Sequence, residues 1–97
     1  HEHSRFSVEL RNGYEMEFDS AGKLLEVDSP DRNNLTQGIL NDVLPAKAVN
    51  HLREKGVLKQ VDDVKILRNG NYLVGIDKMV NDYTIRFDNN GELSKLK

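Results

Sequence analysis

The chain has 97 residues, of which 37% are hydrophobic and 31% are charged, and it contains no cysteine. This length supports one hydrophobic core rather than two, so we expect a single domain over residues 1–97. The lack of cysteine excludes disulfides, thiol nucleophiles and zinc–thiolate sites. The formal net charge of −2 argues against a general nucleic-acid binder, because such proteins need a clustered positive surface.

The charges are divided unevenly along the chain. Residues 1–44 carry nine acidic and four basic residues, a net charge of −5, whereas residues 45–97 carry seven acidic and ten basic residues, a net charge of +3. Such a division can steer a charged partner or align two copies of the chain, although it also arises in small domains without a functional reason. No apolar run is long enough for a membrane-spanning helix, so we expect no membrane insertion.

Three strands are predicted in the first third of the chain. Apolar and polar side chains alternate in residues 6–11 and again in residues 14–18, as expected for strands with one buried face. Asn12-Gly13 between them predicts a tight hairpin turn, because both residues tolerate a positive φ. A second turn over residues 19–22 leads into a third strand over residues 23–28.

A connector over residues 29–43 precedes one short amphipathic helix. Pro45 suits the first residue of a helix, and Leu44, Ala48, Val49 and Leu52 form an apolar stripe at spacings of three to four. Gly56 offers the left-handed conformation that ends a helix.

The last part of the chain repeats the strand pattern of the first. Strands are predicted over residues 61–68, 72–76 and 83–87, with a final strand from Glu92. The motif Phe-Asp-x-x-Gly-x-Leu occurs twice at one constant offset, beginning at Phe18 and at Phe87. This pattern is typical of an internal repeat. We assign the partial first repeat of three strands to residues 1–28 and the complete second repeat, a helix plus four strands, to residues 44–97.

The first repeat lacks counterparts of the helix and first strand that open the second. Its apolar face therefore needs cover, and this face is expected to consist of Phe6, Val8, Tyr14, Met16 and Phe18. Three sources of cover remain open. They are upstream residues that were removed or are unresolved, the segment Asp31–Val43 of the connector, and dimerisation.

Together these features resemble the PepSY-like, beta-lactamase-inhibitor-like family of small exported bacterial proteins. The residues that carry the resemblance are the paired Phe-Asp-x-x-Gly-x-Leu motifs, the segment Gly22–Asp28, and Leu44-Pro45-Ala46 ahead of the Asn69-Gly70-Asn71-Tyr72 hairpin. The resemblance implies a periplasmic or secreted protein whose signal peptide has been removed. It also implies a binding or inhibitor-like role for the sheet face opposite the helices.

The expected fold class is α+β. We predict a curved antiparallel sheet of about seven strands with one main helix packed on one face, built from tandem half-repeats of which the first is truncated. The polar face of this sheet provides most of the candidate partner-binding residues, which are Glu9, Glu15 and Glu17 on the first hairpin and Lys65, Leu67, Leu73 and Arg86 on the second repeat. Met79 and Val80 are added because they are unusually apolar for a loop.

No residue pattern predicts catalysis. Paired carboxylates such as Glu15 and Glu17 serve in acid–base chemistry and glycoside hydrolysis, but a solvated strand face accounts for them as well. The chain has no His-Glu-x-x-His or Gly-x-Ser-x-Gly motif, so we expect no enzyme, no metal and no cofactor. The favoured function is a non-enzymatic exported module that binds an unknown protein or peptide through the sheet face opposite the helix. The alternative is a structural or assembly protein whose truncated first repeat is completed by a homodimer.

Overall fold

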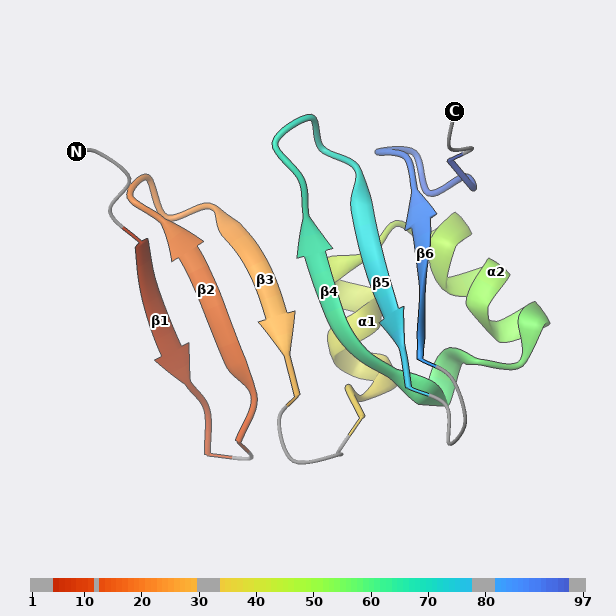
Figure 1. Cartoon of the computed structure of the whole chain (residues 1–97), viewed down its shortest axis with the longest axis horizontal. Coiled ribbons are helices and arrows are strands. Elements are labelled where there is room, and N and C mark those ends of the chain that lie inside the picture. Colours follow the sequence, from red (N-terminus) through yellow and green to blue (C-terminus); the bar gives the residue numbers. More distant parts are fainter. Residues whose placement is uncertain (1–4, 12, 30–33, 78–81, 95–97) are drawn as a thin grey trace.

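The computed structural model describes residues 5–11, 13–29, 34–77 and 82–94, and these form an α+β fold. Within them, one antiparallel sheet contains the strands in chain order, namely β1 (Arg5–Glu9), β2 (Glu15–Asp19), β3 (Leu24–Asp28), β4 (Val61–Ile66), β5 (Tyr72–Ile76) and β6 (Tyr83–Phe87). Between β3 and β4 the chain forms helices α1 (Gln37–Val43) and α2 (Ala46–Lys55) and a short 3₁₀ turn (Leu58–Gln60) (Figure 1). The α+β class and the antiparallel sheet are therefore as predicted.

Two details differ from the sequence prediction. The sheet has six strands, and of the strand expected from Glu92 the described residues show a single bridge between Leu93 and Phe87. The connector contains a second helix, α1, whose amino end is capped by Thr36: the Thr36 hydroxyl oxygen accepts a hydrogen bond from the Ile39 amide at 3.3 Å. No described helix is long and apolar enough to cross a membrane.

Helix α2 begins one residue after the predicted start at Pro45. Pro45 is its N-cap, and Gly56 ends it in the left-handed conformation at φ 81°. Its apolar stripe of Ala48, Val49 and Leu52 is buried against the sheet. Such a stripe stabilises a short helix chiefly through burial, because an isolated helix of this length is marginal in water.

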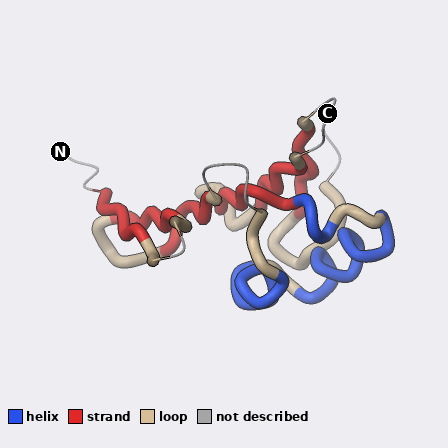
Figure 2. Tube along the Cα trace, turned by 90° about the horizontal axis from the view of Figure 1, so that it is seen from below, coloured by secondary structure: helices blue, strands red, loops and turns tan. Residues whose placement is uncertain are grey.

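The helices cover only one end of the sheet. They lie beneath the part of the sheet that contains β4 to β6, whereas β1 and β2 form a single layer at the other end (Figure 2). Val64 and Val74 are fully buried there, but Phe6 is 49% exposed and Val8 43% exposed. Phe6 stacks on Phe18 of β2, with ring centroids 5.5 Å apart.

The described part of the connector covers only a portion of the apolar face of the first hairpin. Its described part, residues 34–43, leaves Phe6 and Val8 exposed. It shields Tyr14, which is buried and whose hydroxyl donates a hydrogen bond to the Asn34 carbonyl oxygen at 2.9 Å. The connector instead packs its Leu40 into the core beneath the second half of the sheet.

The turns after β2 and β6 have the same hydrogen-bond pattern. In each, the Oδ1 atom of an aspartate, Asp19 or Asp88, accepts hydrogen bonds from the amides two and four residues further on, at 2.9 or 3.0 Å. Each turn also contains a glycine in a left-handed conformation, Gly22 at φ 85° and Gly91 at φ 90°. These turns agree with a tandem arrangement, which stays a prediction for the chain as a whole.

Candidate functional site: the open face of the sheet

Two rows of side chains cross the sheet on the face away from the helices, which we call the open face. Successive residues of a strand alternate between faces, so the neighbours of buried Val27, Val64 and Val74 belong to this face. Strand register defines the first row as Ser7, Glu17, Glu26, Lys65, Leu73 and Arg86. The second row is Glu9, Glu15, Asp28, Asp63, Gly75 and Thr84.

The register places most of the candidate residues together. Glu9, Glu15 and Glu17 lie on the open face of β1 and β2, and Lys65, Leu73 and Arg86 lie in one of the same rows on β4, β5 and β6. Leu67 follows β4 and lines a groove described below. Met79 and Val80 lie outside the described residues.

Charge changes sign along the first row. Glu17 and Glu26 occupy the β2 and β3 positions, and Lys65 and Arg86 occupy the β4 and β6 positions. The second row carries carboxyls as far as Asp63 of β4 and is uncharged beyond it. The open face is thus acidic over β1 to β3 and becomes basic along one row after the junction of β3 with β4.

A groove lies at this junction. Strands β3 and β4 pair only through Glu26–Lys65, Val27–Val64 and Asp28–Asp63, and they diverge beyond the first of these pairs (Figure 1). The groove between them has a volume of about 540 Å³, within the range of small-molecule sites.

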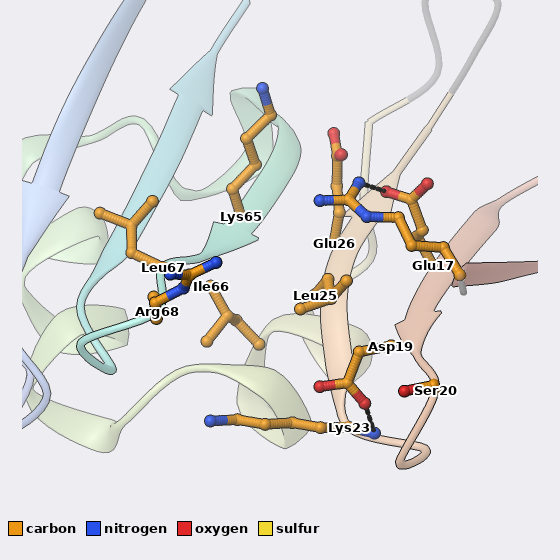
Figure 3. Close-up of a pocket in the computed structure, with 11 residues that line it drawn as sticks. Glu17, Asp19, Ser20, Lys23, Leu25, Glu26, Lys65, Ile66, Leu67 and Arg68 are labelled. Carbon is orange, nitrogen blue, oxygen red and sulfur yellow. Dashed lines mark hydrogen bonds and ion pairs between the residues drawn. The ribbon is translucent and has the colours of Figure 1, made fainter. Parts of the chain in front are cut away.

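The groove has apolar and charged walls. Leu25 of β3 and Ile66 of β4 contribute apolar side chains from its two sides, and Lys65 and Arg68 contribute cations from the β4 side (Figure 3). On the other side the Arg5 guanidinium pairs with the Glu17 carboxylate at 3.1 Å. Both partners of this ion pair are partly exposed, so its contribution to stability is small.

Three carboxyls meet next to the groove on β3 and β4. One oxygen from each of Glu26, Asp28 and Asp63 lies within 4.8 Å of the others. Asp63 Oδ1 is buried and has no hydrogen-bond donor among the described residues. Burial raises the pKa of Asp63 to about 8, and a hydrogen bond with Glu26 and the charges of Glu26 and Asp28 act in the same direction, against the charge of Lys65.

The environment of the cluster favours the protonated form of its aspartates. Burial, followed by the charge of Glu26, also raises the pKa of Asp28, whereas the Ser29 amide and Lys65 lower it. A protonated Asp63 can donate a hydrogen bond to the Glu26 carboxylate, which relieves the repulsion between them. Carboxylate oxygens are also ligands for hard divalent cations, but one proton is sufficient to explain the arrangement.

The hollow over the carboxyls themselves is small. It has a volume of about 150 Å³ and is lined by Ser7, Glu15, Glu17, Glu26 and Asp28. Ligand pockets usually have volumes of roughly 300 Å³ or more. The carboxyls are therefore described as part of the charged open face.

Sequence reasoning missed Glu26, Asp28 and Asp63. The alternation of the strand over residues 23–28 already places the first two on the polar face, so this signal was present. Asp63 carries no such signal, because residues 29–60 separate β3 from β4 and β4 contains a register shift between Val61 and Asp63.

Neither of two sequence comparisons finds a match. No protein-family model matches the chain, and a search of curated proteins finds no match. The resemblance to the PepSY-like family therefore stays a prediction from the motifs quoted above.

Proposed function

We propose that the protein is a non-enzymatic binding module that takes up an extended peptide, or an extended segment of a protein, on the open face. The observation that carries this proposal is the groove of about 540 Å³ at the junction of β3 with β4, where the charge of the first row changes sign. The apolar walls of the groove provide contact area for the peptide, and its charged walls determine the orientation of the peptide.

Backbone geometry favours an extended ligand. Leu24 and Leu25 of β3 and Ile66 of β4 lie outside the β3–β4 pairing. Their edges that face the groove are not paired with each other, so an extended peptide that crosses from β3 to β4 can form main-chain hydrogen bonds with them. The charges predict the polarity of the peptide: its basic end lies over β2 and β3, and its acidic end lies toward Lys65 and Arg68.

An exchange of two paired charges tests this proposal. Glu26 and Lys65 are cross-strand partners, so the double variant Glu26→Lys, Lys65→Glu keeps an opposite-charge pair and the net charge but reverses the charges beside the groove. We expect short peptides with segregated charges to bind better than peptides of the same composition with intermixed charges. Amide chemical shifts should change at Leu25 and Ile66, and the exchange variant should weaken the binding several-fold.

The matched control is the exchange Glu54→Lys, Lys55→Glu on α2, where both residues are exposed and remote from the groove. It should leave the peptide affinity unchanged. Shift changes confined to the helix side of the molecule, or equal effects of the two exchanges, would contradict the proposal.

We propose in addition that the module acts outside the cytoplasm. The support is the family resemblance of the Phe-Asp-x-x-Gly-x-Leu motifs. Immunodetection in fractionated cells of the source organism tests it, and detection only in the cytoplasmic fraction would contradict it.

An assembly role is the second candidate function. It is favoured by the exposure of Phe6 and Val8, because a homodimer would remove this apolar surface from water. Light scattering over a range of protein concentrations distinguishes the two functions. A monomer at all concentrations would exclude the assembly role and leave the peptide-binding proposal intact.

A further inference from the structure

The outer edge of β1 is open. β1 stands first in the sheet and, within the described chain, pairs with β2 alone (Figure 1). We propose that two copies of the chain pair through this edge, with their β1 strands antiparallel and Ser7 opposite Ser7, so that the two sheets become one. This interface makes the assembly role, the second candidate function, specific, and it does not depend on the peptide groove.

The backbone of β1 presents hydrogen-bonding groups at the open edge. The Leu10 amide donates a hydrogen bond to the Tyr14 carbonyl oxygen across the first hairpin at 2.7 Å, so the backbone groups of Leu10 face β2. Backbone groups alternate between the two edges of a strand. Those of Arg5, Ser7 and Glu9 therefore face outward, where no described strand pairs with them.

One register of a β1–β1 pair uses all of these outward groups. With Ser7 opposite Ser7 of the partner subunit, Arg5 lies opposite Glu9 of the partner subunit, and two-fold symmetry repeats this pair at the other end. Each residue pair exchanges two main-chain hydrogen bonds, which gives about six in total. A slip of two residues in either direction loses one residue pair and both charge pairs.

The charges on the open face favour the same register. Within one copy Glu9 lies directly opposite Glu15, and like charges in this position repel. Arg5 of the partner subunit would lie on the other side of Glu9 and relieve this repulsion. Arg5 already pairs with Glu17 at 3.1 Å, but its side chain is 58% exposed, so its guanidinium has further donors for a second carboxylate.

The other side of the strand is compatible with this pairing. The same register places Phe6 opposite Val8 of the partner subunit, and an aromatic side chain opposite a β-branched one is a favourable cross-strand pair. Sheet edges that avoid association usually carry a proline, a lysine or a bulge. The segment Arg5–Glu9 contains neither proline nor lysine, and it pairs with β2 without a register shift.

The opposite edge of the sheet is partly occupied. Beside β6, the Ser94 amide donates a hydrogen bond to the Arg86 carbonyl oxygen at 2.9 Å, and Leu93 forms a bridge with Phe87. This edge therefore does not offer its full length to β1 of another copy. Pairing of β1 with β1 closes as a two-fold dimer, whereas pairing of β1 with β6 would continue as a filament.

Two charge variants test the register by complementation. Arg5→Glu and Glu9→Arg each place like charges at both ends of the β1–β1 pair, whereas an equimolar mixture of the two variants restores opposite charges at both ends. Sedimentation velocity at about 10 µM to 1 mM suits the weak association expected of a small interface. We expect the wild type to dimerise, each variant alone to dimerise roughly tenfold or more weakly, and the mixture to associate at least as tightly as the wild type.

Matched controls separate this edge from a general effect of charge. Lys55→Glu and Glu54→Arg make the same changes in net charge on the exposed face of α2, and their mixture should associate no more tightly than the wild type. Ser7→Pro removes an outward N–H and no hydrogen bond to β2, so it should abolish the dimer. Unchanged amide shifts outside β1 and β2 would show that this variant is folded.

Concentration-dependent amide shifts of the wild type should be largest at Arg5, Ser7 and Glu9. A wild type that is monomeric throughout, a mixture of the charge variants that does not associate, or a dimer that persists in Ser7→Pro would each overturn the edge interface. A dimer that persists in Ser7→Pro would still allow an assembly role through another surface. None of these results affects peptide binding in the groove, which is measured separately.

Discussion

At the scale of single residues, Asp63 has the environment furthest from that of a solvated carboxylate. It lies in a row of four carboxyl positions that crosses β1 to β4, with Asp28 as its direct cross-strand partner. Burial and the proximity of Glu26 both disfavour its charged form. Ionisation of Asp63 therefore lowers the free energy of unfolding of the protein.

The stability of the protein should depend on pH through Asp63. Its pKa is raised from 3.8 to about 8 on folding, so its stabilising contribution is complete below the unfolded pKa and is lost as the pH rises through about 8. Asp63→Asn keeps the shape and stays neutral. We expect the variant to equal the wild type at low pH and to exceed it by roughly 1–2 kcal/mol above pH 8, a figure reduced for solvent screening.

Urea unfolding across this pH range measures the effect. Glu54→Gln on the exposed face of α2 is the control, and its unfolding free energy should follow that of the wild type at every pH. If Asp63→Asn and the wild type lost stability in parallel toward high pH, the assignment of the proton to Asp63 would be wrong.

The grouping of the carboxyls on the open face could be predicted from the sequence only where it depends on the alternation of side chains along a strand. Glu9, Glu15 and Glu17 were placed on one face because a strand alternates side chains with a period of two. Their meeting with Asp63 depends on how β4 aligns with β3, and the local sequence does not encode that alignment. Packing of the two helices between these strands sets it.

At the scale of elements, the turns after β2 and β6 provide a matched pair of glycine positions, one without and one with a contact to α2. Gly22 and Gly91 both need a left-handed backbone, but only Gly91 is pressed against a helix. Gly22→Ala should cost about 1–2 kcal/mol of unfolding free energy from backbone strain alone. Gly91→Ala should cost about 3 kcal/mol or more, because the added methyl group also displaces Pro45 and Ala48.

Chemical denaturation of both variants provides the measurement. Equal losses in the two variants would show that the close approach of α2 to Gly91 does not contribute to stability.

The helices differ in how well the sequence predicts them. α2 has a proline at its start, a glycine at its end and a regular apolar stripe between them, all of which are local signals. α1 has seven residues, includes Gly38 and buries Leu40 alone, so its local pattern is too weak to distinguish it from a loop. Its formation depends on contact with the core and on α2, which neighbouring residues do not reveal.

At the scale of the whole molecule, helix cover divides the sheet into two unequal halves. β4 to β6 form one layer of a two-layer arrangement, while β1 and β2 have solvent on both faces (Figure 2). The amides of β1 and β2 should therefore exchange with solvent roughly tenfold or more faster than those of β4 and β5. Hydrogen exchange followed by NMR measures this, and equal protection of both halves would show that the first hairpin is covered in solution.

The fold class could be predicted because alternation and turn residues are repeated through the chain. Which apolar face is covered by helices could not be predicted, since the apolar side chains of residues 6–18 alternate in the same way as those of residues 72–87. The sequence of a strand indicates that one of its faces is apolar. It does not indicate which element packs on that face.

The order of the strands has a consequence for how the chain folds. Four of the five strand pairings join neighbours linked by short turns, and only β3 with β4 must close across both helices. Local pairings form quickly, whereas closing a long segment slows a pairing, so we expect the junction of the two halves to form last. The three carboxyls meet only in that final step. Their repulsion should therefore act mainly on the rate at which the finished sheet reopens, and little on the rate at which each half first assembles.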